Sequence, residues 1–242
     1  MAKPATRKTA TRLSIDDRTA DILNAARQII SEKGYEKILL ADIARQAGIV
    51  EGTIYRYFQN KRDLLVKVAE LWFGEQLTAD SHLDGISGTQ NKLRHVAWRT
   101  LSIIKREPVL SRFMLMELRP DPNYRSTPFF ELNRHFTRET LQICKDAIAS
   151  GEFHADVSPT LMRDMLHGCI EHRTWAFLRG EGDFSPDEVA EGIATVVYRG
   201  MLAHPVPSQP AAALETLVSR LEKVAERLEQ KPPRAGRGNQ LR

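Results

Sequence analysis

The chain has 242 residues, of which 42% are hydrophobic, and its 35 Lys and Arg residues outnumber its 31 Asp and Glu residues. No apolar stretch approaches the ~18–20 residues of a membrane span, no secretory signal opens the sequence, and two cysteines are too few for a disulfide framework. We therefore expect a cytoplasmic protein, with no membrane partner, that buries one large core or a small domain beside a larger one.

Charge is unevenly distributed along the chain. Residues 1–67 carry 13 basic and 8 acidic side chains, residues 68–228 carry 18 and 22, and the last 14 residues carry 4 and 1. A basic N-terminal region followed by an acidic body, residues 68–228, predicts a polyanion-binding surface near the N-terminus. Residues 1–13 are expected to form a disordered basic arm, which either lies along DNA or is a solvated tail without a role.

Three helical patterns follow the arm, and the second and third of them are short. Ser14 is expected to cap the first, with Asp17 as its capping-box partner, and Gly34 ends it. The apolar face of this helix is predicted to be Ile15, Ile22, Ala26, Ile29 and Ile30. The second pattern starts at Leu40, and Gly48 supplies the left-handed backbone position that ends it.

The third pattern runs over residues 51–58, with Ile54, Tyr55 and Phe58 on the side predicted to pack. The residues predicted to lie largely on the other side are Gly52, Thr53, Arg56 and Tyr57. Helices this short must dock on a third helix, which is how a helix-turn-helix presents its second helix to the DNA major groove. The alternative interpretation is a small helical domain whose aromatic side chains are simply core.

A dozen positions in this region stand at a characteristic fixed spacing. They are Gly34-Tyr35, Asp42-Ile43-Ala44, Ala47-Gly48, Gly52-Thr53-Ile54-Tyr55, Tyr57-Phe58, Lys61 and Asp63-Leu64-Leu65. At these residues the chain resembles the TetR family of one-component transcriptional regulators, and the likeness extends over residues 14–70. The resemblance implies an all-α fold with a three-helix helix-turn-helix DNA-binding domain at residues 14–60. A larger helical ligand-binding and dimerisation domain would then occupy residues 61–204.

Two residues depart from the family pattern. Leu39 and Val50 stand where the family usually has hydroxyl residues that open the second helix and the recognition helix. A hydroxyl at an N-cap accepts a bond from a backbone N–H and can reach a phosphate, whereas Leu and Val do neither. This departure predicts weaker phosphate contacts, with more of the contact made by Lys61, Tyr57 and the arm.

The resemblance and the exposed positions together imply the DNA contacts. Gly52, Thr53 and Arg56 are expected at base edges, and Tyr57 and Lys61 at phosphates. The full set of expected DNA-binding residues is Arg12, Gly52, Thr53, Tyr55, Arg56, Tyr57 and Lys61. The expected partner is a palindromic double-stranded DNA operator, which a homodimer would read.

Helices are predicted throughout the rest of the chain. A linking helix covers residues 61–77, and a Gly/Ser-rich break covers residues 82–90. The further predicted helices are Asn91–Arg106, Val109–Leu118, Phe129–Ser150, Ser158–Arg179 and Ser185–Ala203, with a proline-rich loop at Pro120–Pro128.

In the TetR family, the last two long helices of the ligand domain pair with their counterparts in a homodimer. The corresponding helices here carry small and apolar residues on one face each. The expected dimer-interface residues are Leu161, Met165, Gly168, Val189, Ile193, Val196, Val197 and Gly200. The competing interpretation is that these faces form the internal core of a monomer.

The C-terminal region begins with a proline-rich break. Residues 205–230 are expected to contain an accessory helix, Ala212–Gln230, with a heptad seam of two repeats. We expect it to pack on its own body or on the dimer partner, because a free-standing coiled coil needs more repeats. Residues 231–242 are expected to be a disordered tail.

Met and aromatic side chains are frequent in the body. Each of them is usually core, but together they can enclose an apolar cavity. The expected pocket residues are Trp98, Phe113, Met114, Phe136, Met165 and Trp175. Residues 167–193 also resemble the acyl-CoA-responsive fatty-acid-metabolism repressors within the TetR family, which implies a long-chain acyl-CoA as the small apolar effector.

Enzymatic interpretations have little support in the sequence. His167, Glu171 and His172 lie close together on one predicted helix, but no second cluster completes a metal site, and a salt-bridged pair is the ordinary interpretation. No phosphate-binding loop, dinucleotide fingerprint or nucleophile elbow is present. We therefore expect no catalytic residue, no metal and no cofactor.

The sequence favours a ligand-responsive repressor that a small apolar effector releases from its operator. The effector would be a fatty acyl-CoA, or an unrelated hydrophobic or aromatic compound if the chain controls an efflux or catabolic operon. Two other classes stay open. A DNA-compacting protein would bind without sequence preference, and a helical enzyme or carrier would act without DNA.

Overall fold

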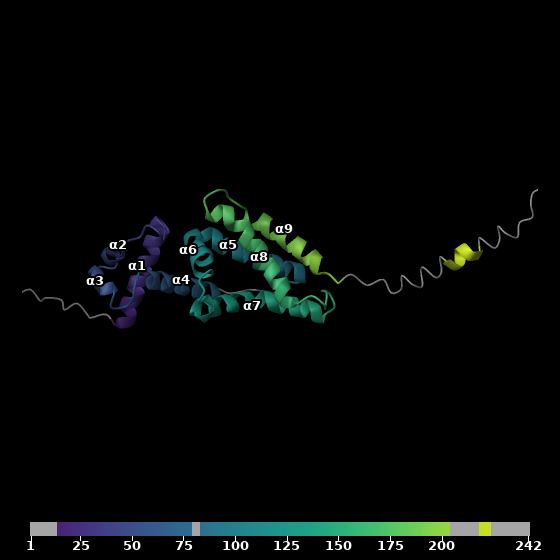
Figure 1. Cartoon of the computed structure of the whole chain (residues 1–242), viewed down its shortest axis with the longest axis horizontal. Helices are drawn as coiled ribbons and strands as arrows, with labels where there is room; N and C mark the ends of the chain where they lie inside the picture. Colours follow the sequence, from purple (N-terminus) through teal and green to yellow (C-terminus); the bar gives the residue numbers. More distant parts are fainter. Residues whose placement is uncertain (1–13, 79–82, 204–217, 224–242) are drawn as a thin grey trace, which may run out of the picture. The chain divides into compact units, whose positions relative to one another are not determined.

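The computed structural model describes residues 14–78, 83–203 and 218–223 (Figure 1). Its α-helices are α1 (Ile15–Lys33), α2 (Leu40–Gln46), α3 (Glu51–Ile54), α4 (Lys61–Thr78), α5 (Thr89–Arg106), α6 (Pro108–Phe113), α7 (Pro128–Ala149), α8 (Pro159–Leu178) and α9 (Pro186–Met201). A π-helical turn, η1 (Met114–Leu118), continues α6, and a 3-10 turn, η2 (Tyr124–Ser126), precedes α7. Within the described residues the only β-pairing is one bridge between Phe153 and Leu202, so the all-α fold class is confirmed.

Local sequence signals explain most helix ends. Ser14 and Asp17 form a complete capping box at the start of α1, as expected. The side chains of Ser158 and Ser185 accept bonds from backbone N–H groups at the starts of α8 and α9. Gly34 ends α1 with a φ of 77°, a left-handed conformation that residues with a Cβ rarely adopt.

One hydrophobic cluster, here called the first core, joins α1–α4 to α6 and α7. Trp72 and Phe73 of α4 are buried in it, and the ring of Phe73 lies 5.1 Å from that of Phe129 and 5.2 Å from that of Phe136. Tyr35, in the loop after α1, lies 5.0 Å from Phe113 of α6. The first core therefore spans the domain boundary expected after residue 60.

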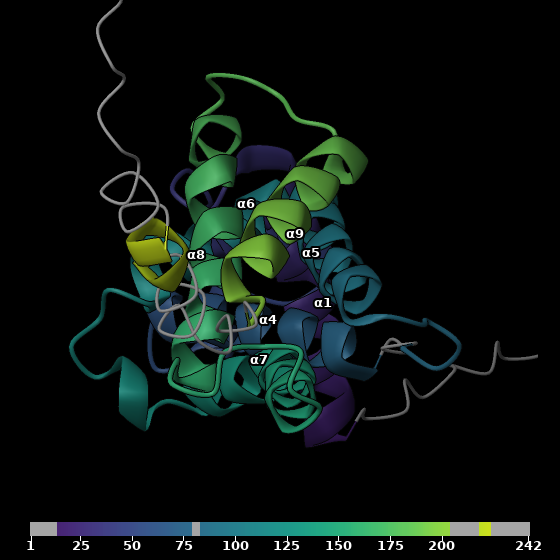
Figure 2. The ribbon, with the colours of Figure 1, turned by 90° about the vertical axis from the view of Figure 1, so that its right-hand side faces the viewer.

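A second core is formed by α5, α7, α8 and α9. Fully or nearly fully buried side chains from all four helices meet there: Leu93, Val96, Leu101, Ile143, Cys144, Met162, Leu166, Ile170, Ala190 and Ala194. Figure 2 shows α8 and α9 side by side with α5 behind α9. Burial raises the pKa of the Cys144 thiol to about 11, so this cysteine packs as a small apolar group.

The structure corrects several predicted elements. The third helix was expected over residues 51–58 but α3 ends at Ile54, and the chain continues to Phe58 as tight turns. The predicted helix Val109–Leu118 changes to π-helical geometry after Phe113. Ile15, expected on the apolar face of α1, is exposed because it lies in the first turn, beyond the reach of the core.

The C-terminal region is described only in part. Residues 218–223 are helical, in agreement with that part of the expected accessory helix, and they belong to a unit distinct from residues 1–202. The rest of the expected helix, the arm at residues 1–13 and the tail at residues 231–242 lie outside the described residues. In the described part of the chain, no helix has the combination of length and apolar character that crossing a membrane requires.

Candidate DNA-binding surface and internal cavity

The helix-turn-helix consists of α2, the turn at Gly48 and α3. Ile54 and Phe58 are buried in the first core and anchor α3 and the turns after it to that core. Tyr55, which we expected to pack beside them, is instead 56% exposed, because the chain leaves helical geometry directly after Ile54. Its exposure places Tyr55 with the residues that could reach DNA.

The other predicted DNA-binding residues are mostly accessible. Gly52 and Arg56 are exposed and Thr53 is half-buried. Tyr57, expected on the exposed side, packs in part against the first core. Arg12 lies outside the described residues.

Two large apolar side chains stand at the starts of the helix-turn-helix helices. Leu39 precedes α2 and is 63% exposed, and Val50 precedes α3 and is 78% exposed. Neither makes a side-chain capping bond, as the sequence predicted. The starts of α2 and α3 therefore keep backbone N–H groups without a side-chain cap.

Lys61, at the start of α4, is bound to the loop between α1 and α2. Its Nζ donates to the backbone oxygen of Ile38 at 2.8 Å and to that of Glu36 at 3.4 Å. An ammonium group has three N–H donors, so these bonds leave one for another acceptor. The side chain therefore ties α4 to the helix-turn-helix in the absence of DNA.

Polar contacts also connect α4 and the α1–α2 loop to the residues around η1. Arg62 of α4 donates to the Asp121 carboxylate at 2.8 Å and to the backbone oxygen of Glu117 at 3.4 Å. The hydroxyl of Tyr35 donates to the Glu117 carboxylate at 3.4 Å. Bonds from the Asn123 backbone N–H and from Arg62 lower the pKa of Asp121 below its usual value, so this carboxyl stays ionised beside α4.

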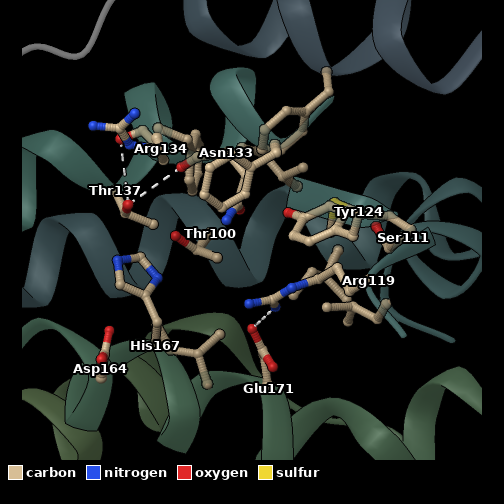
Figure 3. Close-up of a pocket in the computed structure, with 18 of the residues that line it drawn as sticks. Thr100, Ser111, Arg119, Tyr124, Asn133, Arg134, Thr137, Asp164, His167 and Glu171 are labelled. Atoms are coloured by element: carbon tan, nitrogen blue, oxygen red, sulfur yellow. Dashed lines mark hydrogen bonds and ion pairs between the residues drawn. The ribbon is translucent and has the colours of Figure 1, made fainter. Parts of the chain in front are cut away.

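The body contains a cavity of about 660 Å³ between α4, α5, η1, α7 and α8 (Figure 3). This volume lies within the range of about 300–1,000 Å³ that small-molecule sites occupy. Its apolar lining consists of Trp72, Phe73, Ile103, Ile104, Met114, Leu115, Phe130, Phe136 and Ile170. Its polar lining consists of Thr100, Ser111, Arg119, Tyr124, Arg125, Asn133, Arg134, Thr137, Arg163, Asp164, His167 and Glu171.

The cavity is positively charged. Four arginines line it and only two carboxylates do, and the carboxylates are both paired. Arg119 pairs with Glu171 across the cavity, as Figure 3 shows, and Arg163 binds the neighbouring Asp164 at 2.7 Å. Arg125 and Arg134 are exposed, and Arg134 also pairs with Glu131 of its own helix at 3.2 Å. The lining therefore suits a ligand that has both an apolar part and an anionic group.

His167 contributes a neutral polar group to the same cavity. Its Nε2 lies 3.0 Å from the hydroxyl of Thr140, which is fully buried. Burial, and after it the charges of Arg163 and Arg119, lower the pKa of His167 from 6.5 to about 4. Near neutral pH the imidazole is therefore uncharged.

An apolar face of α8 and α9 is open to solvent in the single chain. Leu161, Met165 and Trp175 of α8 and Val196 of α9 are exposed, and the backbone of Gly168 and of Gly200 is accessible between them. Exposed apolar side chains gathered on two neighbouring helices are typical of an interaction surface.

Two family profiles match the chain. Residues 22–68 match the profile described as bacterial regulatory proteins, tetR family, and residues 87–201 match the one described as tetracyclin repressor-like, C-terminal domain. The matches include both the helix-turn-helix and the body. The chain belongs to the TetR family. It is a transcriptional regulator rather than an enzyme, as the sequence predicted.

Individual relatives agree with this assignment. The fatty acid metabolism regulator protein of Bacillus subtilis is 24% identical over 181 residues, which cover 74% of this chain and 93% of the relative. The HTH-type transcriptional repressor KstR2 of Mycolicibacterium smegmatis is 23% identical over 202 residues, which cover 76% and 90%. The solved structure of the transcriptional regulator FadR from Bacillus subtilis in complex with stearoyl-CoA has a TM-score of 0.64 and 23% identity, and the match covers 75% of this chain and 98% of that one. This structural likeness shows that the chain has the TetR fold.

Of the six expected pocket residues, two line the cavity and four do not. Met114 and Phe136 line the cavity. Phe113 is buried in the first core and is not part of the cavity lining, because it turns toward Tyr35. The other three, Trp98, Met165 and Trp175, are exposed and lie outside the lining. They were predicted wrongly because helical spacing identifies a face of α5 or α8 but does not say what that face contacts.

Some expected dimer-interface residues also differ. Val197 is only 6% exposed and belongs to the second core, so it supports α9 from inside. Val189 and Ile193 are half-buried against the same core. The expectation that all three belong to an outward face is therefore wrong for Val197, whose neighbour Val196 is the residue that points outward.

Most polar residues of the cavity were not predicted from the sequence. His167 and Glu171 were considered as a metal site or a salt-bridged pair, whereas His167 bonds to Thr140 and Glu171 pairs with Arg119. Arg119 directly precedes the predicted proline-rich loop and Tyr124 lies in the middle of it, and a loop prediction assigns no direction to either side chain. A serine among the apolar residues of α6, Ser111, was the one available signal of a polar group in the interior.

Proposed function

We propose that this TetR-family chain is a repressor that binds a palindromic operator as a homodimer and leaves it when an amphipathic effector occupies the cavity. Residues 14–60 would be its DNA-binding domain and residues 61–204 its ligand-binding and dimerisation domain. The proposal rests on the cavity. Trp72 and Phe73 of α4 line it and also belong to the first core, which contains the buried residues of the helix-turn-helix.

The DNA contacts are proposed for the accessible residues of α3 and the turns after it. Gly52, Tyr55 and Arg56 are exposed and would approach base edges, with Thr53 beside them. The remaining N–H donor of Lys61 would bind a phosphate, as would Tyr57. The basic arm, with Arg12, would add backbone contacts.

The homodimer would use the exposed apolar face of α8 and α9. One helix-turn-helix reads too few base pairs to define a genomic site, and a two-fold pair reads two half-sites one helical turn apart. Leu161, Met165 and Val196 supply apolar area at this face, and Gly168 and Gly200 allow close approach of helices. Val189 and Ile193 would contribute their accessible edges.

We propose the fatty acyl-CoA class for the effector. The cavity combines aromatic and aliphatic walls with exposed arginines, and an acyl-CoA combines a long chain with phosphates. A solved relative is described in complex with stearoyl-CoA, and a curated relative is named for fatty acid metabolism. The long-chain acyl-CoA is thus the first ligand to test, with CoA alone as its control.

Release of DNA would follow from a shift in the position of α4. An effector favours the conformation in which it binds more tightly, and its differential affinity sets the limit of the shift. Trp72 and Phe73 line the cavity on the same helix that begins at Lys61 beside the proposed DNA surface. Arg62 and Glu117 join α4 to η1, which also contributes Met114 and Leu115 to the cavity.

The proposal is tested with an operator selected from random DNA and labelled for fluorescence anisotropy. Stearoyl-CoA is expected to release the operator at fixed salt, and CoA alone is not. Thr137→Trp places a large ring in the cavity, so this variant should still bind the operator but should no longer respond to stearoyl-CoA. Release by CoA alone, or an unchanged response in Thr137→Trp, would contradict the proposed site.

A further inference from the structure

The cavity contains buried polar atoms that no protein group satisfies. Among the described residues, the indole Nε1 of Trp72 and the Oγ of Ser111 have no hydrogen-bond partner, and the hydroxyl of Tyr124 has only the Arg119 guanidinium beside it. Trp72, Ser111 and Tyr124 line this one cavity, and Trp72 and Ser111 are fully buried. They come from three separate elements, α4, α6 and η2. In Figure 3 the hydroxyl of Tyr124 points toward the middle of the cavity.

Unpaired polar atoms of this kind are uncommon in native proteins. Most buried polar groups are bonded, because each one left without a partner loses its bonds to water and gains nothing in return. An indole N–H can only donate, whereas a serine or tyrosine hydroxyl can donate and accept. A ligand that satisfies Trp72 must therefore present an acceptor atom, such as an oxygen. An oxygen can also accept a hydrogen bond from the hydroxyl of Ser111.

The position of the charges indicates which kind of oxygen this is. Arg125 and Arg134, at the exposed part of the lining, are where an ionised head group would remain in contact with water. Burying an ionised group costs far more than burying a hydrogen-bonded neutral one. The fully buried groups of Trp72 and Ser111 are thus left for a neutral part of the ligand.

We infer that the effector carries a neutral oxygen, a hydroxyl or a carbonyl, on the chain that enters the buried part of the cavity, and that Ser111 and Trp72 select it over a plain hydrocarbon chain of equal length. This inference rests on the proposed function, because it names the ligand class of the same cavity. The effector is then an amphipath whose buried chain carries an oxygen in addition to the thioester carbonyl that every acyl-CoA has.

The competing explanation is an ordered water that bonds to these groups permanently. The two explanations differ for Ser111→Ala. If the ligand supplies the partner, the ligand-free variant loses no bond, so its melting temperature should equal or exceed that of the wild type. Its preference for an oxygenated ligand should fall, because only Trp72 is then left to select it. A lower melting temperature with an unchanged preference would indicate the water-mediated, structural role.

Ligand binding can be measured directly at the cavity. The chain has three tryptophans, and Trp98 and Trp175 are exposed whereas Trp72 is fully buried in the cavity wall. The double variant Trp98→Phe, Trp175→Phe leaves Trp72 as the single fluorophore. A hydrogen bond to its Nε1 is expected to shift its emission to longer wavelength, which contact with a plain chain would not do.

The experiment compares stearoyl-CoA with stearoyl-CoA derivatives that carry one hydroxyl or keto group near the thioester, at mid-chain or on the terminal carbon. At least one derivative should bind about tenfold more tightly than stearoyl-CoA, and Ser111→Ala should reduce that ratio to the part that the Trp72 indole alone contributes. Equal affinities in the wild type, or a ratio that Ser111→Ala leaves unchanged, would overturn this inference. Equal affinities accompanied by operator release would leave the proposed function intact, whereas no binding of any of these ligands would overturn both.

Discussion

Val196 gives the sharpest test of the proposed dimer, because it is exposed in the single chain and would be covered in the pair. Its side chain is 72% exposed, on the outer face of α9. Full burial of a valine contributes about 1.5–3 kcal/mol, so covering this fraction contributes about 1–2 kcal/mol per copy. Two-fold symmetry doubles the contribution to about 2–4 kcal/mol, or a factor of roughly 30 to 700 in the dissociation constant.

Val196→Asp should weaken the dimer by more than this factor. The substitution removes the apolar contact and adds the desolvation of an unpaired carboxylate in each copy, which costs several kcal/mol. The stability of the monomer should change little, because the side chain is exposed there. Sedimentation velocity over a range of protein concentrations measures the dissociation constant, and anisotropy with the operator measures the loss of cooperative DNA binding.

Val50→Asp is the matched control. It makes the same chemical change at a valine that is 78% exposed, but at the start of α3 on the proposed DNA surface. This variant should keep the dimer and lose affinity for DNA through repulsion of phosphates. The reasoning is refuted if Val196→Asp sediments as the wild type does, or if Val50→Asp dissociates the dimer equally.

Three further predictions concern single residues. Val50→Ser should raise the stability by about 1 kcal/mol in thermal denaturation and tighten operator binding, because it supplies the missing N-cap; a lower melting temperature would contradict this. Lys61→Ala should weaken binding to all DNA sequences alike and reduce the slope of log affinity against log salt concentration by about one. It should also lower the melting temperature through loss of its bonds to the α1–α2 loop. An unchanged salt slope would refute the phosphate contact. Because burial lowers the pKa of His167 from 6.5 to about 4, the unfolded state binds more protons between these pH values. Stability should therefore rise with pH from about 4 to 6.5, and denaturant titrations of His167→Gln should show a smaller rise across that window; an identical pH profile would refute the assignment.

The helix-turn-helix could be predicted closely from the sequence because its signals are local. The capping box of Ser14, the left-handed Gly34 and the uncapped Val50 each act within one turn of backbone, and all three were predicted. Tyr55 was assigned to the packing side because a regular helix was assumed over residues 51–58. That assumption failed when α3 ended after Ile54.

The cavity could be predicted much less well, because it depends on contacts between distant segments. Arg119 and Glu171 are 52 residues apart and meet only when the end of η1 has packed against α8. The π-helical turn at η1 changes which side chains of the predicted helix face inward, and periodicity assumes a constant helical repeat. Trp98 and Trp175 illustrate the remaining ambiguity, since aromatic residues at helical spacing can line a cavity or an exposed face.

The most direct test of the central proposal is the reciprocity between ligand and operator. The affinity of the Trp98→Phe, Trp175→Phe protein for stearoyl-CoA is measured through Trp72, once without DNA and once with saturating operator. The factor by which operator weakens ligand binding must equal the factor by which ligand weakens operator binding, because both report one coupling free energy. Equal factors well above one are predicted. Ligand binding that is indifferent to the operator would contradict the proposal that occupation of the cavity controls DNA binding.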